Sequence, residues 1–326
     1  MSSLKNSANS SKAAHPDQYE NQYELAGTTR LLIGTWRLID PKISTASISS
    51  MFLGVCAATL QGAINIPWLL MAIIGILFLE AAKNASGDIF DFDSGADLAV
   101  SPENRSPFSG GKRVIVDGLM TRRQTIVVAA VFYFLGISTG LFIVFFHEPK
   151  ILTIGAIGVG LAYFYNAPPV KLSYRGLGEF AVAITYGPLI CCGTYLVLRH
   201  ELPTAVVFLS IPLGILIAAF LVINEFPDRV ADLGAGKKNL VVRLGEQQAT
   251  RLFMLMIVTA YSLILLLPLS GLPQTVWLGF AGLPLGIMAA KRLLVTQQTS
   301  KLIPAQGWTL LSFTLATLGL GIGLLI

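Results

Sequence analysis

The densest acidic run of this chain reads Asn84-Ala-Ser-Gly-Asp88-Ile-Phe-Asp91-Phe-Asp93-Ser-Gly-Ala-Asp97 and continues to Gly110-Gly-Lys-Arg113. Asn84, Asp88 and Asp91 are four and three residues apart, so on a helix they share one face. Asp97 follows where the chain leaves that helix. The run therefore predicts a cluster of oxygen ligands at a helix end.

A second acidic run repeats this design later in the chain. Asn224, Asp228 and Asp232 are spaced four residues apart, and three cations follow them: Lys237, Lys238 and Arg243. Two carboxylate faces would repel each other unless a positive group lay between them. Hard oxygen ligands favour Mg²⁺, and Mg²⁺ together with Lys or Arg binds phosphorylated ligands. The two runs predict one site for a magnesium ion and a phosphorylated ligand.

The composition places both runs in a membrane protein. Of the 326 residues, 54% are hydrophobic and only 13% are charged, which is too apolar for a water-soluble domain of this size. We expect an all-α polytopic membrane protein with about nine transmembrane helices around a central cavity. The expected spans are 43–62, 67–88, 125–146, 151–166, 178–198, 203–226, 251–269, 274–290 and 307–326. We expect residues 1–40 to form a polar, partly disordered N-terminal segment and residues 41–326 to form the transmembrane domain.

The basic residues predict the orientation. Of the 23 lysines and arginines, all but Lys83, Lys150 and Arg199 fall in segments on the same predicted side as the N-terminus. Cytoplasmic loops carry such an excess of positive charge, so both acidic runs are expected to face the cytoplasm from the inner (plasma) membrane. This asymmetry accounts for the net charge of +5 without nucleic acid as a partner.

Several features leave two interpretations open. Residues 31–36 beside Arg30 form either a short helix on the membrane surface or a simple connector. Glu80 and Lys83, three residues apart inside a span, either pair with each other or belong to the site. Lys171 and Arg175 follow a double proline that ends a helix, and they either anchor topology or clamp phosphate.

The chemistry of a membrane-embedded diphosphate site narrows the substrate class. A diphosphate that enters from a bilayer has an apolar tail, so the leaving group would be diphosphate and the transferred group an isoprenoid. An electron-rich aromatic acceptor would capture the resulting carbocation. Mg²⁺ and nearby cations would neutralise the charge on the leaving oxygens.

Motifs along nearly the whole chain resemble the UbiA superfamily of intramembrane prenyltransferases. They are Asp88-x-x-Asp91 with Ser94-Gly-Ala-Asp97, Gly110-Gly-Lys112-Arg113, Tyr165 with Leu177-Gly-Glu179, Asn224-x-x-x-Asp228-x-x-x-Asp232, Gly236-Lys237 and Val242-Arg-Leu-Gly245. The Ser-Gly-x-Asp spacing and the Arg-Gly-Leu-Gly-Glu run are most similar to the 1,4-dihydroxy-2-naphthoate branch, which makes menaquinone or phylloquinone precursors.

The resemblance implies a set of site residues. Catalytic roles fall to Asp88, Asp91, Asp97, Asp228 and Asp232; Mg²⁺ would be held by Asp88, Asp91, Asn224, Asp228 and Asp232; substrate would be bound by Asn84, Lys112, Arg113, Tyr165, Lys171, Arg175 and Asn224. One position departs from the family, which has asparagine immediately before the position of Asp88. This chain has Gly87 there, so Asn84 either replaces that ligand or the ligand is missing.

Three alternatives to prenyl transfer onto 1,4-dihydroxy-2-naphthoate remain. The acceptor could be 4-hydroxybenzoate, homogentisate or a chlorophyllide. A cation-coupled transporter also places acids in membrane helices, although nearer the midplane of the bilayer. A phospholipid synthase would use a diphosphate-activated substrate, but the Asp-Gly-x-x-Ala-Arg signature of that class is missing from this sequence.

Overall fold

The structure is a computed structural model that describes residues 27–326, and in this range it is helical without strands. Its principal helices are α1 (Gly27–Ile39), α2 (Pro41–Thr59), α3 (Ile66–Asp93), α4 (Ala96–Ala99), α5 (Arg122–Phe146), α6 (Ile151–Phe164), α7 (Gly178–Ile184), α8 (Ile190–Arg199), α9 (Thr204–Gly234), α10 (Leu240–Leu266), α11 (Leu283–Val295) and α12 (Thr299–Leu325). Short helical turns connect them: η2 (Pro102–Asn104), η3 (Leu172–Tyr174), η4 (Thr185–Leu189), η5 (Leu267–Ser270) and η6 (Gln274–Gly282).

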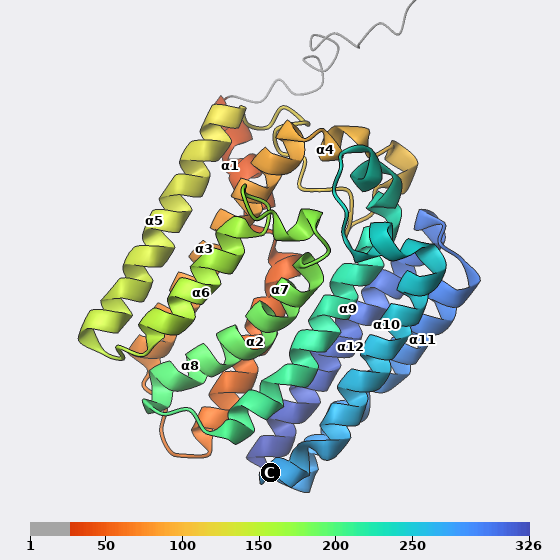
Figure 1. The fold of residues 1–326 in the computed structure, drawn as a ribbon. Coiled ribbons are helices and arrows are strands. Elements are labelled where there is room, and N and C mark those ends of the chain that lie inside the picture. The colour runs from red at the N-terminus through yellow and green to blue at the C-terminus, as the bar shows by residue number, and fades with distance from the viewer. Residues whose placement is uncertain (1–26) are drawn as a thin grey trace, which may run out of the picture.

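The long helices run roughly side by side as one bundle (Figure 1). Helix α3 packs on α5, α9 packs on α10, and α12 packs against both α2 and α9. The largest group of buried apolar side chains joins α2, α8, α10, α11 and α12 to α9, with Leu213, Ile223, Phe253 and Phe313 among its members. Helix α9 is therefore the central helix of the bundle.

Seven helical stretches of the described part are long and apolar enough to cross a membrane. They are Ile66–Ser94, Arg122–Phe146, Gly178–Arg199, Thr204–Gly234, Leu240–Ser270, Gln274–Val295 and Thr299–Leu325. The remaining two predicted spans correspond to α2 and the short apolar α6. Each predicted span is thus helical, which confirms an integral membrane protein with about nine helices.

Two predicted boundaries are wrong in a way that affects the site. The span predicted to end at residue 226 continues through Pro227 to Gly234, so Asp228 and Asp232 are part of α9. Proline removes one backbone donor but does not stop this helix, which neighbouring helices enclose. Helix α10 begins at Leu240 instead of 251, with a kink at Gly245, where φ is 72° and ψ is 168°.

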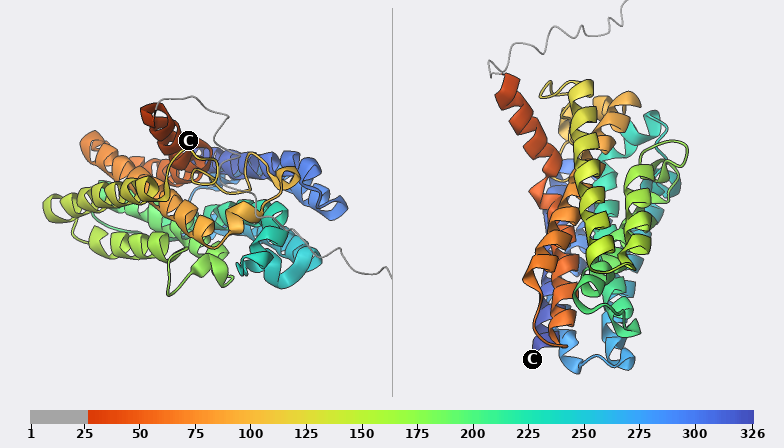
Figure 2. Two further views of the ribbon diagram at one scale, coloured as in Figure 1. Left: turned by 90° about the horizontal axis from the view of Figure 1, so that it is seen from above. Right: turned by 90° about the vertical axis from the view of Figure 1, so that its left-hand side faces the viewer.

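Helix α1 lies beside the end of the bundle that carries the acidic residues and is tilted away from the bundle (Figure 2). Residues 1–26, most of the segment predicted to be partly disordered, lie outside the described residues. The stretch 31–36 is helical, so the connector interpretation is wrong. Leu32 and Trp36 are exposed on α1, as expected for a helix that lies on a membrane surface.

Candidate active site

The two acidic runs lie at the C-terminal ends of α3 and α9, at the same end of the bundle. Ten of the predicted site residues line one polar pocket of about 620 Å³ there. They are Asn84, Asp88, Asp91, Asp97, Lys112, Arg113, Tyr165, Asn224, Asp228 and Asp232. Lys171 and Arg175 are not among the lining residues.

Lys237 connects the two acidic runs. Its Nζ atom lies 3.3 Å from Asp91 Oδ2 and 3.7 Å from Asp232 Oδ1. Burial would lower the pKa of Lys237, but Asp232 and Asp91 outweigh it and raise this pKa well above its ordinary value. The positive group expected between the acidic faces is, in this structure, a lysine ammonium.

Tyr174 and Asn239 fix the orientation of the two carboxylates that face Lys237. The Tyr174 hydroxyl donates to Asp91 Oδ1 over 3.1 Å and also contacts Ser94 Oγ at 2.8 Å. Asn239 caps α10 by accepting from the Val242 N–H, and its amide donates to Asp232 Oδ2 over 2.8 Å. The start of α10 is thereby tied to the second acidic run.

The loop 105–115 joins the acidic runs through its backbone. The Gly110 N–H donates to Asp228 Oδ2 over 3.0 Å. The backbone N–H groups of Val114 and Ile115 donate to the two oxygens of Asp88 over 3.0 and 3.2 Å. In this structure Asp88 therefore holds the loop, and its role as a metal ligand stays a prediction.

Gly111 brings the loop against Asp97. Its φ of 74° lies in the left-handed region, and a Cβ added there would come within 2.1 Å of Asp97 Oδ1. Asp97 is buried, and burial together with Asp91 and Asp88 raises its pKa to about 8. The lack of a side chain at Gly111 thus permits the close approach of the loop to Asp97.

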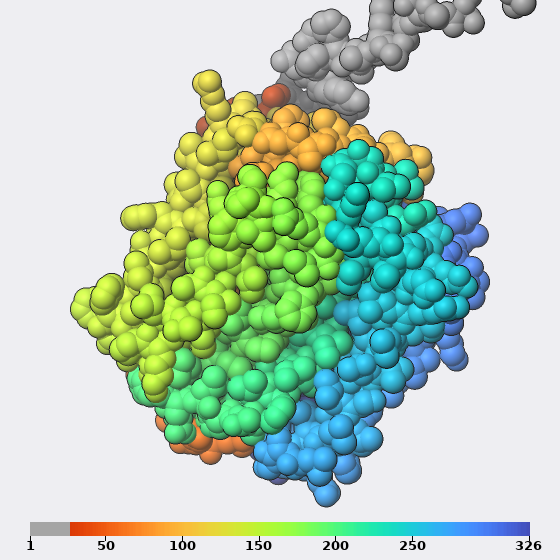
Figure 3. Space-filling view, viewed as in Figure 1, coloured from red at the N-terminus to blue at the C-terminus, as the bar shows by residue number. Residues whose placement is uncertain are grey.

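Two cations of the same loop line the pocket. Lys112 forms an ion pair with Asp40, which lies between α1 and α2. Arg113 donates to the Asp97 carbonyl and lies 3.4 Å from Asp117 Oδ1. Figure 3 shows the loop segment and the residues that follow α9 side by side at this end of the molecule. Lys112 and Arg113 therefore bring two positive charges into the pocket that the acidic runs line.

Asn84 is tied to α1. Its amide donates to the Leu38 carbonyl over 3.0 Å, and the side chain is buried in the pocket wall. A side chain at position 87 would meet the amide of Asn166, since a Cβ on Gly87 would lie 3.1 Å from Asn166 Nδ2. Asn166 thus occupies the space into which the family's asparagine would project, and the ligand role of Asn84 stays a prediction.

Lys171 and Arg175 contact their own loop. The Arg175 guanidinium donates to the Pro169 carbonyl over 2.9 Å, and Lys171 Nζ lies 4.9 Å from the centre of the Tyr174 ring. These contacts favour a role in shaping the loop. The phosphate clamp stays a prediction for these two residues.

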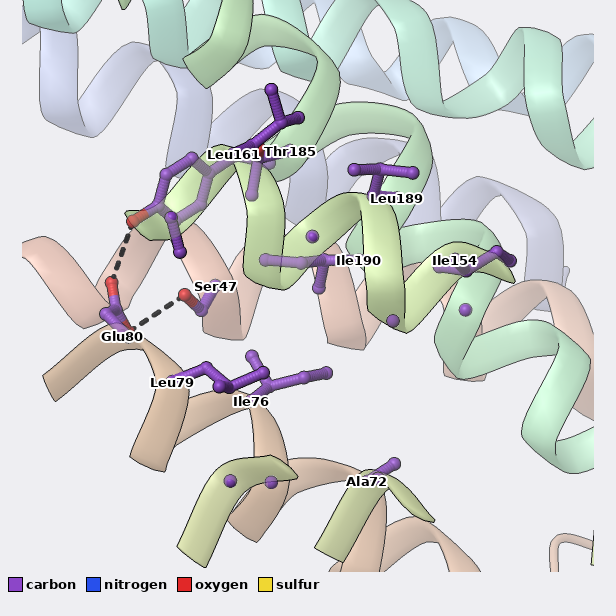
Figure 4. Close-up of a pocket in the computed structure, with 18 of the residues that line it drawn as sticks. Ser47, Ala72, Ile76, Leu79, Glu80, Ile154, Leu161, Thr185, Leu189 and Ile190 are labelled. Atoms are coloured by element: carbon purple, nitrogen blue, oxygen red, sulfur yellow. Dashed lines mark hydrogen bonds between the residues drawn. The ribbon is translucent and has the colours of Figure 1, made fainter. Parts of the chain in front are cut away.

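A second, apolar pocket of about 170 Å³ lies deeper in the bundle, between α3, α5, α6 and the α7–α8 segment. Lys83, Tyr165, Val182 and Tyr186 line both pockets, so the two spaces are adjacent. Figure 4 shows Glu80 as a polar group among apolar side chains such as Ile76 and Leu79. A ligand with a charged head and an apolar tail matches this pair of pockets.

Glu80 does not pair with Lys83. Its carboxylate accepts hydrogen bonds from Ser47 Oγ over 2.9 Å and from the Tyr186 hydroxyl over 3.2 Å (Figure 4). Lys83 Nζ instead lies 4.6 Å from the centre of the Tyr165 ring. The pairing interpretation of these two residues is wrong.

Five residues that line the pocket were missing from the predicted site, namely Lys83, Asn166, Glu225, Lys237 and Asn239. Tyr174, which donates to Asp91, was missing as well. Lys237 had a usable signal, because it belongs to the Gly236-Lys run that resembles the family. Lys83 also had one, as a charge inside a span that could belong to the site. The others had none, because their proximity to the acidic runs arises only when helices and loops distant in sequence pack together.

A magnesium ion fits the residues of this pocket. Asn224 Oδ1 and Asp228 Oδ1 are buried oxygen atoms without a hydrogen-bond partner among the described residues. Within residues 27–326, no three His, Cys, Asp or Glu side chains converge closely enough to hold an ion alone. Mg²⁺ commonly uses one or two carboxylates together with water and substrate phosphates, so such an open set of ligands suits it.

The model of the UbiA prenyltransferase family matches residues 47–318. The chain belongs to the UbiA prenyltransferase family. It is a membrane-embedded prenyltransferase, as its spans and the family together show.

Among relatives, the 1,4-dihydroxy-2-naphthoate octaprenyltransferase of Bacillus subtilis is 26% identical over 89% of this chain and 92% of the relative. The 2-carboxy-1,4-naphthoquinone phytyltransferase of Synechocystis is 29% identical over 58% of each chain.

Among solved structures, a UbiA homologue from Archaeoglobus fulgidus bound to GPP and Mg²⁺ superposes with a TM-score of 0.59 at 16% identity. The match covers 88% of this chain and 99% of the other. The apo UbiA homologue from Aeropyrum pernix gives a TM-score of 0.61 at 15% identity, covering 86% and 98%.

Proposed function

We propose that this UbiA prenyltransferase is Mg²⁺-dependent and transfers a prenyl group from a prenyl diphosphate to 1,4-dihydroxy-2-naphthoate. The observation that carries the proposal is the joining of a charged pocket at the helix ends to an apolar pocket inside the bundle. A prenyl diphosphate has this division of charged head and apolar tail. The names of the relatives from Bacillus subtilis and Synechocystis support a naphthalene acceptor.

The charged pocket would bind the diphosphate. Asp91, Asp228 and Asp232, with Asn224, would hold Mg²⁺, which supplies charge neutralisation when it is bound. Lys112, Arg113 and Lys237 line the same pocket and would donate charge-assisted hydrogen bonds to the diphosphate oxygens. Both ion pairs of Lys237 would then be exchanged for contacts with substrate.

The apolar pocket would hold the start of the prenyl chain away from water. The C–O bond to diphosphate breaks, and its electron pair leaves on the diphosphate. A ring carbon of the electron-rich acceptor forms the new C–C bond with the prenyl carbon. The ring then releases a proton, or its carboxyl group as carbon dioxide, and becomes aromatic again.

We place the acidic end of the bundle on the cytoplasmic side of the plasma membrane. The lysines and arginines of residues 27–326 support this orientation, because most of them lie at that end. Lys150 and Arg199, two of the exceptions, donate to the backbone carbonyls of His200 and Ala58 near the opposite end.

Product analysis tests the proposal. Purified protein is incubated with Mg²⁺, prenyl diphosphates of several lengths and a panel of acceptors, which includes 1,4-dihydroxy-2-naphthoate, 4-hydroxybenzoate and homogentisate. We expect mass spectrometry to detect a prenylated naphthalene product that disappears with a chelator. Prenylation of 4-hydroxybenzoate or homogentisate alone would reassign the acceptor, and undiminished turnover in excess chelator would reject the role of Mg²⁺.

A further inference from the structure

Lys83 lies at the junction of the charged and apolar pockets and has no role in the diphosphate site described above. It lines both pockets, together with Tyr165, Val182 and Tyr186. On α3 it precedes Asp91 by eight residues, which places it about 12 Å deeper along the helix axis. The Cα atom of Lys83 therefore lies about two helical turns deeper in the bundle than that of Asp91.

This ammonium forms no close ion pair with a described carboxylate, and Glu80 and Asp91 attract it only from a longer distance. The acid nearest in sequence, Glu80, has both oxygens engaged by Ser47 and Tyr186. The contact of Lys83 Nζ is with the face of the Tyr165 ring, 4.6 Å from its centre. Other cations of the charged pocket have a hydrogen bond or an ion pair with the protein, namely Arg37, Lys42, Arg105, Lys112, Arg113 and Lys237.

Lys83 is half-buried and lines the apolar pocket. Removing an ammonium from water in this way costs free energy unless an opposite charge binds it. A cation–π contact offsets only part of this cost. Lysine at this position is therefore suited to an anionic ligand that enters from the pocket. The aromatic rings of Tyr165 and Tyr186 beside it suit a flat aromatic body attached to that anion.

We propose that Lys83 binds the carboxylate of an aromatic acceptor and so selects carboxylated acceptors over those that lack this group. This inference rests on the proposed function, because it assigns part of the same site to the second substrate. The diphosphate has three other cations at the helix ends, whereas the acceptor ring must lie below it, next to the first carbon of the prenyl chain. Lys83 lies at this deeper level.

Equilibrium binding tests the inference without turnover. The probes are 1-hydroxy-2-naphthoate and 1-naphthol, which differ by the carboxylate, and binding is followed by quenching of protein fluorescence in detergent. We expect the wild type to bind the naphthoate about ten-fold or more tightly than the naphthol. Lys83→Met should abolish this preference, Lys83→Arg should keep most of it, and Lys291→Met, which removes an exposed lysine of α11, should leave it unchanged.

Binding of a prenyl diphosphate with Mg²⁺ serves as the check that each variant is folded. Unchanged preference for the naphthoate in Lys83→Met would overturn the inference, as would a wild type without such a preference. Loss of diphosphate affinity in Lys83→Met, with naphthoate binding intact, would assign Lys83 to the diphosphate instead. If the wild type prenylates no aromatic acceptor yet shows Lys83-dependent naphthoate binding, the proposed function fails while the anion site remains.

Discussion

Lys237 and Asp91 are 146 positions apart in the sequence, yet the lysine Nζ lies 3.3 Å from Asp91 Oδ2. The same ammonium lies 3.7 Å from Asp232 Oδ1, so one side chain connects the ends of α3 and α9. This contact unites the two acidic runs in one site.

Lys237→Met should therefore lower the rate of prenyl transfer. The loss of one charge-assisted contact costs about 1.5 to 3 kcal/mol, or roughly 10- to 150-fold in rate or in diphosphate affinity. Steady-state kinetics with varied prenyl diphosphate measures the effect. The matched control is Lys238→Met, which removes an adjacent exposed lysine and should remain close to wild type. Equal effects of both substitutions would count against a specific role for Lys237.

Gly111→Ala should disrupt the wall of the charged pocket. The added methyl group would overlap the Asp97 carboxylate, and alanine also disfavours a φ of 74°. Gly118→Ala is the control in the same loop, because Gly118 has a φ of 68° but no atom within 4 Å of an added Cβ. We expect a loss of activity of about 100-fold or more for Gly111→Ala and a much smaller one for Gly118→Ala. If both variants lost activity to a similar extent, backbone strain at a positive φ, and not the overlap with Asp97, would explain the loss.

Lys171→Gln and Arg175→Gln decide between an anchoring role and a phosphate clamp. Since both side chains contact their own loop and lie outside the pocket lining, we expect diphosphate affinity within about two-fold of wild type, well below the effect of a lost charge-assisted contact. Kinetics of both single variants and the double variant provide the test. A decrease of ten-fold or more in diphosphate affinity would establish the clamp and require the loop to move toward the pocket on binding.

The membrane orientation can be tested separately from catalysis. Single cysteines introduced near Gly110 and near Gly236 should be labelled from the cytoplasmic side, and one near Leu272 from the opposite side. An impermeant thiol reagent applied to intact cells and to inverted vesicles distinguishes the sides. Labelling of positions 110 and 236 from different sides would be incompatible with their shared pocket.

Much of the fold could be predicted because hydrophobic length is a local property. The nine spans were predicted from runs of apolar residues, although the end predicted at Phe226 lies eight residues before Gly234 and the helix continues through Pro227. The tertiary surroundings override proline here, because α9 is enclosed by other helices. Local sequence does not contain this information.

The acidic members of the site were also visible in the sequence, because helical spacing aligns Asn84 with Asp88 and Asp228 with Asp232. Their partners could not be predicted in the same way. Asp88 accepts from the backbone of Val114 and Ile115, a contact that depends on the path of a long loop. The charge of Arg175 was evident, but the direction of its side chain depends on the Pro169 carbonyl.

The most direct test of the central claim, that both acidic runs form one Mg²⁺-dependent diphosphate site, is the binding of a prenyl diphosphate to purified protein. Isothermal titration with and without Mg²⁺ compares the wild type with Asp91→Asn and Asp228→Asn. Asp93→Asn is the control, because Asp93 pairs with Arg122 and does not line the pocket. We expect Mg²⁺-dependent binding in the wild type and Asp93→Asn, and a loss of at least ten-fold in affinity in each of the other two variants. Wild-type affinity in either Asp91→Asn or Asp228→Asn would contradict a shared site.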